Sequence, residues 1–393
     1  MTSGSVGAKN HSMDKRITDR GGAIVPGQSS ERWAILTPGG TQLLTAIALL
    51  RMKRIPTDSV EVFSFFHPHN VLMGFIERVS RLFGLCYGGV LEHYVRFYIG
   101  KKQVALNPSG WKWFWNPESY SRQTILRLNS DLNRIKGKNL ITAFKPYDDL
   151  SLLLCALNYP ETIFIADGAV VFGGFAEKQK DWTWRGIRNI AAEIPQTVPI
   201  YGPSYLHTSS KRFGIPSDIP DAILLECYEK LLELPEARRA KELFETRESM
   251  HQCALVLGQN LSPDLAHPFQ DLEYYSALIK ALVIRGFRHI IYKPHPRDEE
   301  TKSRIIRDMV RDCDVKLCVM PPDEACIPVE ALSRFVCTRG WTAFGACSSA
   351  LSGCHDHMHM KVFCVSSNIL PSKTRSIIAE FAANHGFVVQ EIS

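Results

Sequence analysis

The amino-acid sequence predicts an α/β protein made of two successive halves, each built on a parallel sheet. Short apolar stretches alternate with segments of helical spacing from residue 33 onward, and this alternation restarts after residue 250. The order strand, turn, helix, strand is typical of a βαβ unit and therefore of parallel strands. A chain of 393 residues also exceeds the usual size of a single hydrophobic core, which favours two domains.

The first half begins with an apolar strand at residues 33–37 that ends in Pro38-Gly39-Gly40. Apolar residues then recur with mostly helical spacing, which predicts a helix over residues 43–55, and the next apolar stretch predicts a strand at 60–66. The same reasoning places further strands at residues 139–144 and 161–165, separated by a helix at 148–157.

The second half follows a charged helical segment at residues 222–250, which Pro235 is expected to break or kink. Residues 1–30 are rich in Ser, Gly, Lys and Arg and indicate a flexible tail. We therefore expect a tail at 1–30 and domains at 31–250 and 251–393. The remaining predicted elements are strands at 253–257, 289–292, 315–319, 335–338 and 361–365, with helices at 271–284, ended by Gly286, and 302–310.

The composition excludes several classes of protein. A hydrophobic content of 45% and a charged content of 22% are ordinary for a globular chain and argue against disorder, collagen or a coiled coil. The net charge of +6 is small for this length, so nucleic acid is not an expected partner. No apolar stretch reaches the ~18 residues of a membrane span, and the first thirty residues carry no signal-peptide run.

The eleven cysteines are an odd number, scattered along the chain without a C-x-x-C pair. That distribution is typical of reduced thiols in a cytosolic protein rather than of a disulfide framework or a zinc site. We therefore expect a cytoplasmic protein that holds no metal.

Ligands of open parallel sheets bind beyond the carboxyl ends of the strands, so residues that follow predicted strands are the candidates for a site. The first such exit is Ala166-Asp167-Gly168, where an apolar strand delivers a carboxylate into a glycine turn. Asp167 is a candidate general base there. The structural alternative is an Asp-Gly turn that only caps the next element.

The second exit is Lys293-Pro294-His295-Pro296-Arg297. Two prolines restrict the backbone around His295, and two basic residues add positive charge beside it. A histidine held in this way suits an anionic leaving group such as a phosphate, and a purely structural histidine is the alternative.

The third exit is the stretch from Gly345 to Leu351, which contains Ser348 and Ser349. Two consecutive hydroxyls at a predicted helix start favour anion binding, because the backbone N–H groups there add to the side chains. Serine also caps helices for structural reasons alone.

These motifs, in this order, resemble those of bacterial sialyltransferases of the capsular α-2,8-polysialyltransferase and lipooligosaccharide sialyltransferase type. That family has an acidic-acidic-Gly motif, a His-Pro motif and a later Ser-Ser or Ser-Thr motif. The counterparts here are Ala166-Asp167-Gly168, His295-Pro296 and Ser348-Ser349. Gly258-Gln259 resembles the Gly-Gln opening of the family's second domain, and Pro328-Val329-Glu330 resembles its Pro-x-Glu element.

The resemblance covers roughly residues 31–370 and implies a GT-B fold, in which two Rossmann-like domains face a central cleft. It implies a CMP-sialic acid donor, inversion at the anomeric carbon, and no metal or other cofactor. Asp167 would deprotonate the acceptor hydroxyl and His295 would stabilise or protonate the departing phosphate. The donor-binding residues that it implies are Gly258, Gln259, Lys293, Pro296, Glu330, Ser348 and Ser349.

The chain departs from the family pattern at Ala166, which stands where the first of two acids is usual. Asp167 would then act alone as the base. Two alternatives to a sialyltransferase follow: a transferase for another CMP-activated ulosonic acid such as Kdo, and a non-catalytic glycan-binding relative.

Residues 81–145 form a basic segment. It contains eleven Lys or Arg and three acidic residues, which gives a local net charge of +8. Three tryptophans within it offer flat faces for sugar rings. We expect a groove for an anionic glycan acceptor that includes Lys101, Lys102, Lys112 and Arg122, or else peripheral contact with an anionic membrane surface. A solvated basic face is the structural alternative.

Two other motifs suggest metal binding only superficially. The stretch from His355 to His359 holds three histidines and one aspartate, yet no second motif completes a site, which favours a polar loop. Asp312-Cys313-Asp314 follows a predicted helix rather than a strand, so we interpret it as helix-end surface.

Overall fold

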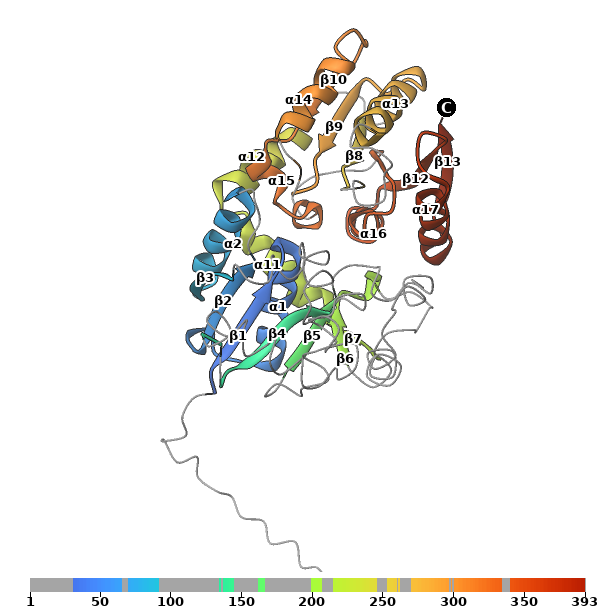
Figure 1. Ribbon diagram of the computed structural model, residues 1–393. Helices are drawn as coiled ribbons and strands as arrows, with labels where there is room; N and C mark the ends of the chain where they lie inside the picture. The colour runs from blue at the N-terminus through green and yellow to red at the C-terminus, as the bar shows by residue number, and fades with distance from the viewer. Residues whose placement is uncertain are drawn as a thin grey trace, which may run out of the picture. The chain divides into compact units, whose positions relative to one another are not determined.

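The structure is a computed structural model, and it describes residues 31–65, 70–91, 134–135, 137–144, 162–166, 199–206, 215–245, 253–259, 261, 270–296, 298, 300–333 and 340–392. Residues 31–393 form one compact unit. Its described strands form two sheets, both with every pair of neighbours parallel (Figure 1).

The first sheet has the order β3-β2-β1-β4-β5-β6-β7. Its strand order reverses between β1 and β4, as in a Rossmann fold. The five residues of β1 are all buried, which matches the continuous apolar run that predicted this strand. The strands are β1 (Trp33–Thr37), β2 (Val60–Phe65), β3 (Cys86–Leu91), β4 (Asn139–Phe144), β5 (Thr162–Ala166), β6 (Pro199–Gly202) and β7 (Ile215–Asp218).

The second sheet repeats the same pattern in the order β10-β9-β8-β11-β12-β13, with its reversal between β8 and β11. Strands β8 and β9 are buried along their whole length. The strands are β8 (Cys253–Leu257), β9 (His289–Lys293), β10 (Lys316–Val319), β11 (Thr342–Gly345), β12 (Lys361–Ser367) and β13 (Val388–Ile392). Two Rossmann-like sheets confirm the predicted α/β, GT-B fold class.

Helix α1 (Gly40–Lys53) begins directly after the glycine turn and ends at Arg54, which has a left-handed backbone with a φ of 56°. Nine of its residues are buried, among them Leu43, Ile47 and Leu50, so it is a core helix. It packs against β1 and against α11 (Asp221–Leu231). Helix α2 (Asn70–Leu82) lies beside α1.

The predicted charged helix of residues 222–250 is two helices, α11 and α12 (Pro235–Phe244). Pro235 is the first residue of α12, a position where its missing N–H costs nothing, so the expected break is confirmed. The chain between the two sheets therefore consists of α11 and α12 followed by residues 246–252, which lie outside the described residues.

The helices of the second half are α13 (Gln270–Ile284), α14 (Glu300–Met309), α15 (Pro322–Ala325), α16 (Ala350–Asp356) and α17 (Ser372–His385), with a short 3-10 turn, η6, at Val329–Leu332. Gly286 ends the α13 segment with a φ of +94°, a conformation that glycine adopts without strain. Helix α17 packs on β12 and β13.

Some predicted elements lie outside the described residues, and the structure has strands that were not predicted. The strand predicted at residues 335–338 and the helix predicted at 148–157 lie outside the described residues, as does the predicted tail at 1–30. The strand that immediately precedes the serine motif is β11, which the sequence did not predict, because Thr-Ala-Phe-Gly is short and ends in glycine. The domain boundary at residue 250 stays a prediction, although the last strand of the first sheet ends at Asp218 and the first strand of the second begins at Cys253.

Candidate functional site

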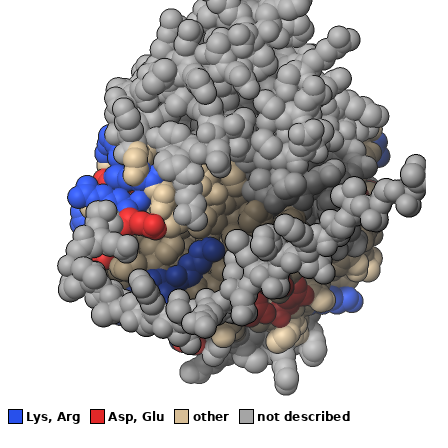
Figure 2. All heavy atoms as spheres, turned by 90° about the horizontal axis from the view of Figure 1, so that it is seen from below, with Lys and Arg blue, Asp and Glu red and all other residues tan. Residues whose placement is uncertain are grey.

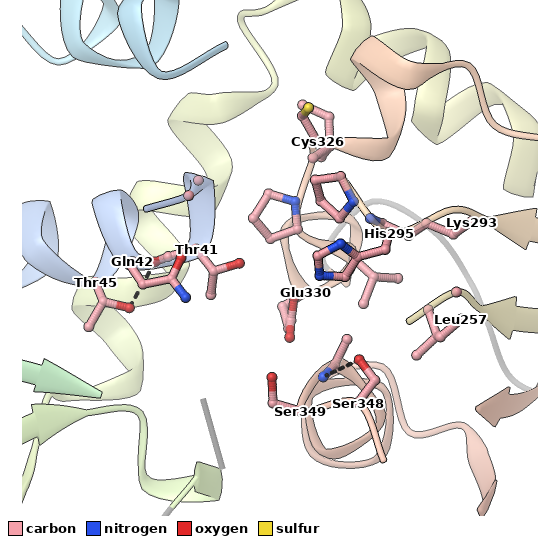
Figure 3. Close-up of a pocket in the computed structure, with 18 of the residues that line it drawn as sticks. Thr41, Gln42, Thr45, Leu257, Lys293, His295, Cys326, Glu330, Ser348 and Ser349 are labelled. Atoms are coloured by element: carbon pink, nitrogen blue, oxygen red, sulfur yellow. Dashed lines mark hydrogen bonds between the residues drawn. The ribbon is translucent and has the colours of Figure 1, made fainter. Parts of the chain in front are cut away.

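The site is a pocket of about 280 Å³ at the carboxyl ends of strands from both sheets (Figure 3). The first half contributes the loop after β1, the first turns of α1 and the end of β5. The second half contributes the exits of β8 and β9, the stretch around η6 and the start of α16. The pocket therefore adjoins the strand-order reversal of each sheet, where open α/β sheets bind their ligands.

Most of the predicted donor-binding residues line this pocket together. Gly258, Lys293, His295, Pro296, Glu330, Ser348 and Ser349 are all part of its wall. Gln259 does not line it and lies immediately behind, hydrogen-bonded to the segment that leads to Ser348. These predicted residues, separated by as many as 91 positions in the chain, thus meet at one cavity.

Gly258 brings the exits of β8 and β9 into direct backbone contact. Its N–H donates to the carbonyl oxygen of Lys293 at 2.7 Å. A Cβ at residue 258 would lie 2.9 Å from the His295 nitrogen and 2.9 Å from the Lys293 oxygen. Only glycine fits this approach, and it places residue 258 against the His-Pro loop.

The His295 loop is closed by two hydrogen bonds to Asp298. The His295 N–H donates to Asp298 Oδ2 at 3.0 Å, and the Asp298 N–H donates to the His295 oxygen at 2.8 Å. Lys302 binds the same carboxylate oxygen at 3.0 Å. The prolines on either side restrict the backbone further, so the loop itself sets the backbone position of His295.

Gln259 connects the β8 exit to the serine motif. The Cys347 N–H donates to Gln259 Oε1 at 3.0 Å, one residue before Ser348. The Gln259 N–H in turn donates to the Tyr275 hydroxyl at 2.6 Å. Ser348 Oγ accepts the N–H of Ala350 at 3.3 Å (Figure 3). Ser348, Ser349 and Ala350 line the pocket, so the start of α16 faces it.

Two ionisable groups, Lys293 and Glu330, are buried in the pocket wall at 8% and 4% exposure. Lys293 Nζ donates to the Ala325 oxygen at 2.5 Å. Burial lowers the pKa of Lys293, and burial raises the pKa of Glu330 to about 7, with Lys293 opposing part of that rise. Gly353 makes room for Glu330, because a Cβ there would lie 2.2 Å from Glu330 Cγ.

We expect Glu330→Gln to raise the melting temperature more at pH 8 than at pH 5. Glu330 has a raised pKa in the folded state, so the stability that it contributes as a neutral acid is present below pH 4.5 and is lost as the pH rises through 7. The full effect is up to about 3 kcal/mol. Thermal melts at both pH values test this against the exposed control Glu273→Gln. Equal shifts at the two pH values would contradict a buried, costly carboxylate.

The sequence did not predict the wall that α1 provides. Thr41, Gln42 and Thr45 line the pocket, and Figure 3 shows Thr41 and Gln42 extending from α1 toward Glu330. Gly39 precedes the helix without a side-chain cap, and the first turn contains no acid. The available signal was Pro38-Gly39-Gly40 after a buried strand, which is the place for a close approach to a ligand.

The first half also contributes Ala166 and Tyr205. Ala166 ends β5 and lines the pocket. Asp167, the predicted base, follows it directly and lies outside the described residues. Tyr205 is nearly buried, packs edge-on against His357 with ring centroids 4.9 Å apart, and has a pKa raised by burial.

The predicted acceptor residues Lys101, Lys102, Lys112 and Arg122 lie outside the described residues. The described basic residues of the segment 81–145 are already engaged: Arg81 pairs with Glu77 at 2.6 Å, Lys138 pairs with Glu61, and Arg134 donates to the Gly88 oxygen. Figure 2 likewise shows basic and acidic side chains next to one another on the face seen from below. The predicted acceptor groove stays a prediction.

The two superficial metal motifs do not form a cluster. His355 Nδ1 lies 2.6 Å from Asp356 Oδ1 at the exposed end of α16, whereas His357 packs on Tyr205. Asp314 is 97% exposed and lies 3.8 Å from Arg288. Among the residues that the structure describes, no group of three His, Cys, Asp or Glu side chains could hold a metal ion.

Two further findings concern the whole described chain. Its nine cysteines are thiols rather than disulfides. Within the same residues, no helix has the length and apolar character needed to span a bilayer.

In a comparison with known families, the model of the alpha-2,8-polysialyltransferase family matches residues 204–363. This range includes Gly258, His295, Glu330 and Ser348, and excludes Asp167 and the α1 wall. The match confirms the resemblance drawn from the His-Pro and Ser-Ser motifs. A search of curated proteins found no match to the chain.

Several solved structures are similar to this one at low sequence identity. A putative UDP-N-acetylglucosamine 2-epimerase from Listeria monocytogenes is 10% identical with a TM-score of 0.46, over 86% of this chain and 79% of that one. A spinosyn rhamnosyltransferase complexed with thymidine diphosphate is 11% identical with a TM-score of 0.46, over 91% and 86%. A glycosyltransferase from Streptomyces nogalater is 10% identical with a TM-score of 0.46, over 92% and 87%.

Proposed function

We propose, from the premise that the chain is a glycosyltransferase with a polysialyltransferase-type segment at residues 204–363, that it transfers sialic acid from a CMP-activated donor to a glycan. The transfer would invert the anomeric carbon and need no metal. The expected acceptor is an anionic glycan, and the expected compartment is the cytoplasm, with peripheral contact to an anionic membrane surface as a further expectation.

One observation supports the proposal most: the His-Pro loop, Glu330 and the Ser-Ser motif line a single pocket with Ala166 of the other sheet. A CMP-sugar has a nucleoside, one phosphate and an acidic sugar. The pocket offers a buried carboxyl group for hydroxyls, a histidine and two serines for a phosphate, and a neutral polar wall on α1.

The chemistry requires an anion to leave and a hydroxyl to attack. As the bond between the anomeric carbon and the phosphate oxygen breaks, His295, Ser348 and Ser349 would stabilise the negative charge of CMP by hydrogen bonds. Such positioned donors contribute several kcal/mol of transition-state stabilisation. Asp167, which follows Ala166 in the chain, would take the proton of the acceptor hydroxyl.

Ala166 favours a second candidate, a glycan-binding relative that no longer transfers. Its side chain cannot accept a proton, although the strand end that carries it still lines the pocket. The two candidates share nucleotide binding and differ in turnover.

The deciding experiment incubates the protein with CMP-sialic acid and candidate acceptors, with and without EDTA, and measures CMP release. Release in both conditions supports metal-independent transfer, and release only with another CMP-ulosonic acid would replace the donor. Loss of release with EDTA would contradict metal independence. Binding of CMP without release from any donor would support the glycan-binding alternative, and CMP binding is detected as a rise in melting temperature.

We expect Thr41→Val and Gln42→Leu each to reduce turnover about tenfold, while the affinity for CMP changes less than twofold. The α1 wall carries no ionisable side chain and faces Glu330, so it suits the neutral polar groups of the sugar rather than the phosphate (Figure 3). Loss of one such hydrogen bond costs up to about 1.5 kcal/mol, which corresponds to about tenfold. Calorimetry with CMP and initial rates with the donor measure the two effects.

Thr57→Val, at an exposed threonine in the turn before β2, is the matched control and should change neither quantity. Equal losses of CMP affinity and turnover in Thr41→Val would place the nucleotide, not the sugar, against α1.

A further inference from the structure

We propose that Lys302 is a positioning residue for His295, acting through the carboxylate of Asp298. The inference deepens the proposed function, since it concerns the residue expected to stabilise the departing phosphate. Lys302 lies on α14 behind the pocket and does not line it.

The first observation is a buried cluster of three charged side chains. Lys302 Nζ lies 2.6 Å from Asp271 Oδ2 and 3.0 Å from Asp298 Oδ2. The exposed fractions of the three side chains are 12% for Lys302, 4% for Asp271 and 5% for Asp298. Charged side chains are rarely buried to this extent, so the cluster requires an explanation.

The second observation is that the cluster holds the His295 loop by one shared atom. Asp298 Oδ2 accepts both from Lys302 Nζ and from the His295 N–H. The Asp298 N–H donates to the His295 oxygen, so two hydrogen bonds join residues 295 and 298. Without the ammonium, the carboxylate would lose its strongest partner and the His295 backbone its fixed acceptor.

The third observation is that Lys302 also contacts a residue bonded to the β8 exit, where Gln259 lies. Lys302 Nζ lies 4.9 Å from the ring centroid of Tyr275, whose hydroxyl accepts the Gln259 N–H. Gln259 in turn accepts the Cys347 N–H, beside Ser348. Lys302 therefore stands behind both the His-Pro loop and the serine motif.

Stabilisation of the folded state does not by itself explain this cluster of buried charges. Two carboxylates face one ammonium, and Asp271 Oδ1 is buried without a hydrogen-bond partner in the described structure. Burial raises the pKa of Asp271, against the opposing effect of Lys302. Buried ion pairs can often be replaced by apolar side chains without loss of stability, so a role in holding a specific loop geometry accounts better for this arrangement.

The test uses Lys302→Met, which keeps the length of the side chain and removes its charge. Lys280→Met, at an exposed lysine on α13, is the matched control. The first readout is amide hydrogen exchange at residues 295 and 298, which needs no ligand or activity. We expect exchange at both amides to become at least about tenfold faster in Lys302→Met and to stay unchanged in Lys280→Met.

The second readout is a double-mutant cycle on turnover with His295→Ala. Lys302→Met alone should slow turnover at saturating donor by about tenfold or more, because small displacements of a reacting group are costly. In the His295→Ala background it should add nothing. A merely structural lysine would lower the melting temperature and slow both backgrounds equally.

The outcomes separate this inference from the proposed function. Faster exchange at residues 295 and 298 in a protein that transfers no sugar would support the positioning contact and contradict the function. Unchanged exchange, or additive losses in the cycle, would overturn the inference even if the protein is a sialyltransferase. If Lys302→Met does not fold, Asp298→Asn removes the charge at the shared oxygen at constant size, and the same results are expected of it.

Discussion

His295→Ala is expected to reduce CMP release from the donor at least ~10²-fold while the melting temperature stays within a few degrees of the wild-type value. The residue lines the pocket at the exit of β9, on a loop that is fixed by Asp298 and by two prolines. In the proposed transfer its side chain would stabilise or protonate the departing phosphate. Steady-state rates at saturating donor, together with thermal melts, measure both parts of the prediction.

His355→Ala is the matched control, because His355 is 57% exposed at the end of α16 and does not line the pocket. It should leave turnover unchanged. A near-normal rate in His295→Ala would remove this residue from the chemistry and leave the serines as the main phosphate contacts. A loss confined to His355→Ala would instead point to the metal motif that the structure does not assemble.

Gly258→Ala is expected to have the second largest effect, on folding and on turnover together. The added Cβ would lie 2.9 Å from the His295 nitrogen and the Lys293 oxygen and 3.0 Å from Pro294 Cα. All three atoms are backbone, so the loop itself must move. Overpacking of this kind costs about 1–3 kcal/mol of stability, and displacement of His295 should cost about 10²-fold in turnover.

Gly345→Ala is the matched control for this substitution. Gly345 ends β11, and a Cβ there would meet its nearest neighbours at 3.4–3.5 Å, an ordinary contact distance. Melting temperature and turnover should therefore fall in Gly258→Ala and stay close to wild type in Gly345→Ala. Equal behaviour of the two variants would refute the idea that close backbone approach at residue 258 shapes the site.

Three of the strands that the sequence predicted correctly are buried on both faces. Trp33–Thr37, Cys253–Leu257 and His289–Lys293 are buried at every position, and a parallel strand of this kind is a continuous apolar run. The strands that it missed have glycine, proline or polar residues, such as Ile-Pro-Ser-Asp in β7 and Thr-Ala-Phe-Gly in β11. Their pairing with a neighbouring strand makes them strands, and local sequence does not encode that pairing.

The candidate site divides in the same way. The sequence predicted His295 and the two serines, because each follows an apolar stretch and carries a group suited to an anion. Thr41 and Gln42 were missed, since uncharged polar residues at the start of a helix have no distinctive pattern. Asp298 and Lys302 are four positions apart on the chain, yet their link to Asp271, 31 residues before Lys302, arises only from the packing of α13 on α14.

The sequence by itself determined that this protein has two parallel-sheet halves and which strand exits are candidates for a site, because burial and backbone restriction are local properties of the chain. Only the tertiary structure decided which exits meet. Each sheet reverses its strand order, at β1 and β4 and again at β8 and β11, and the exits beside both reversals line one pocket. Strand order depends on hydrogen bonds between segments far apart in sequence, so the lysine behind the histidine and the polar wall on α1 became visible only in the folded chain.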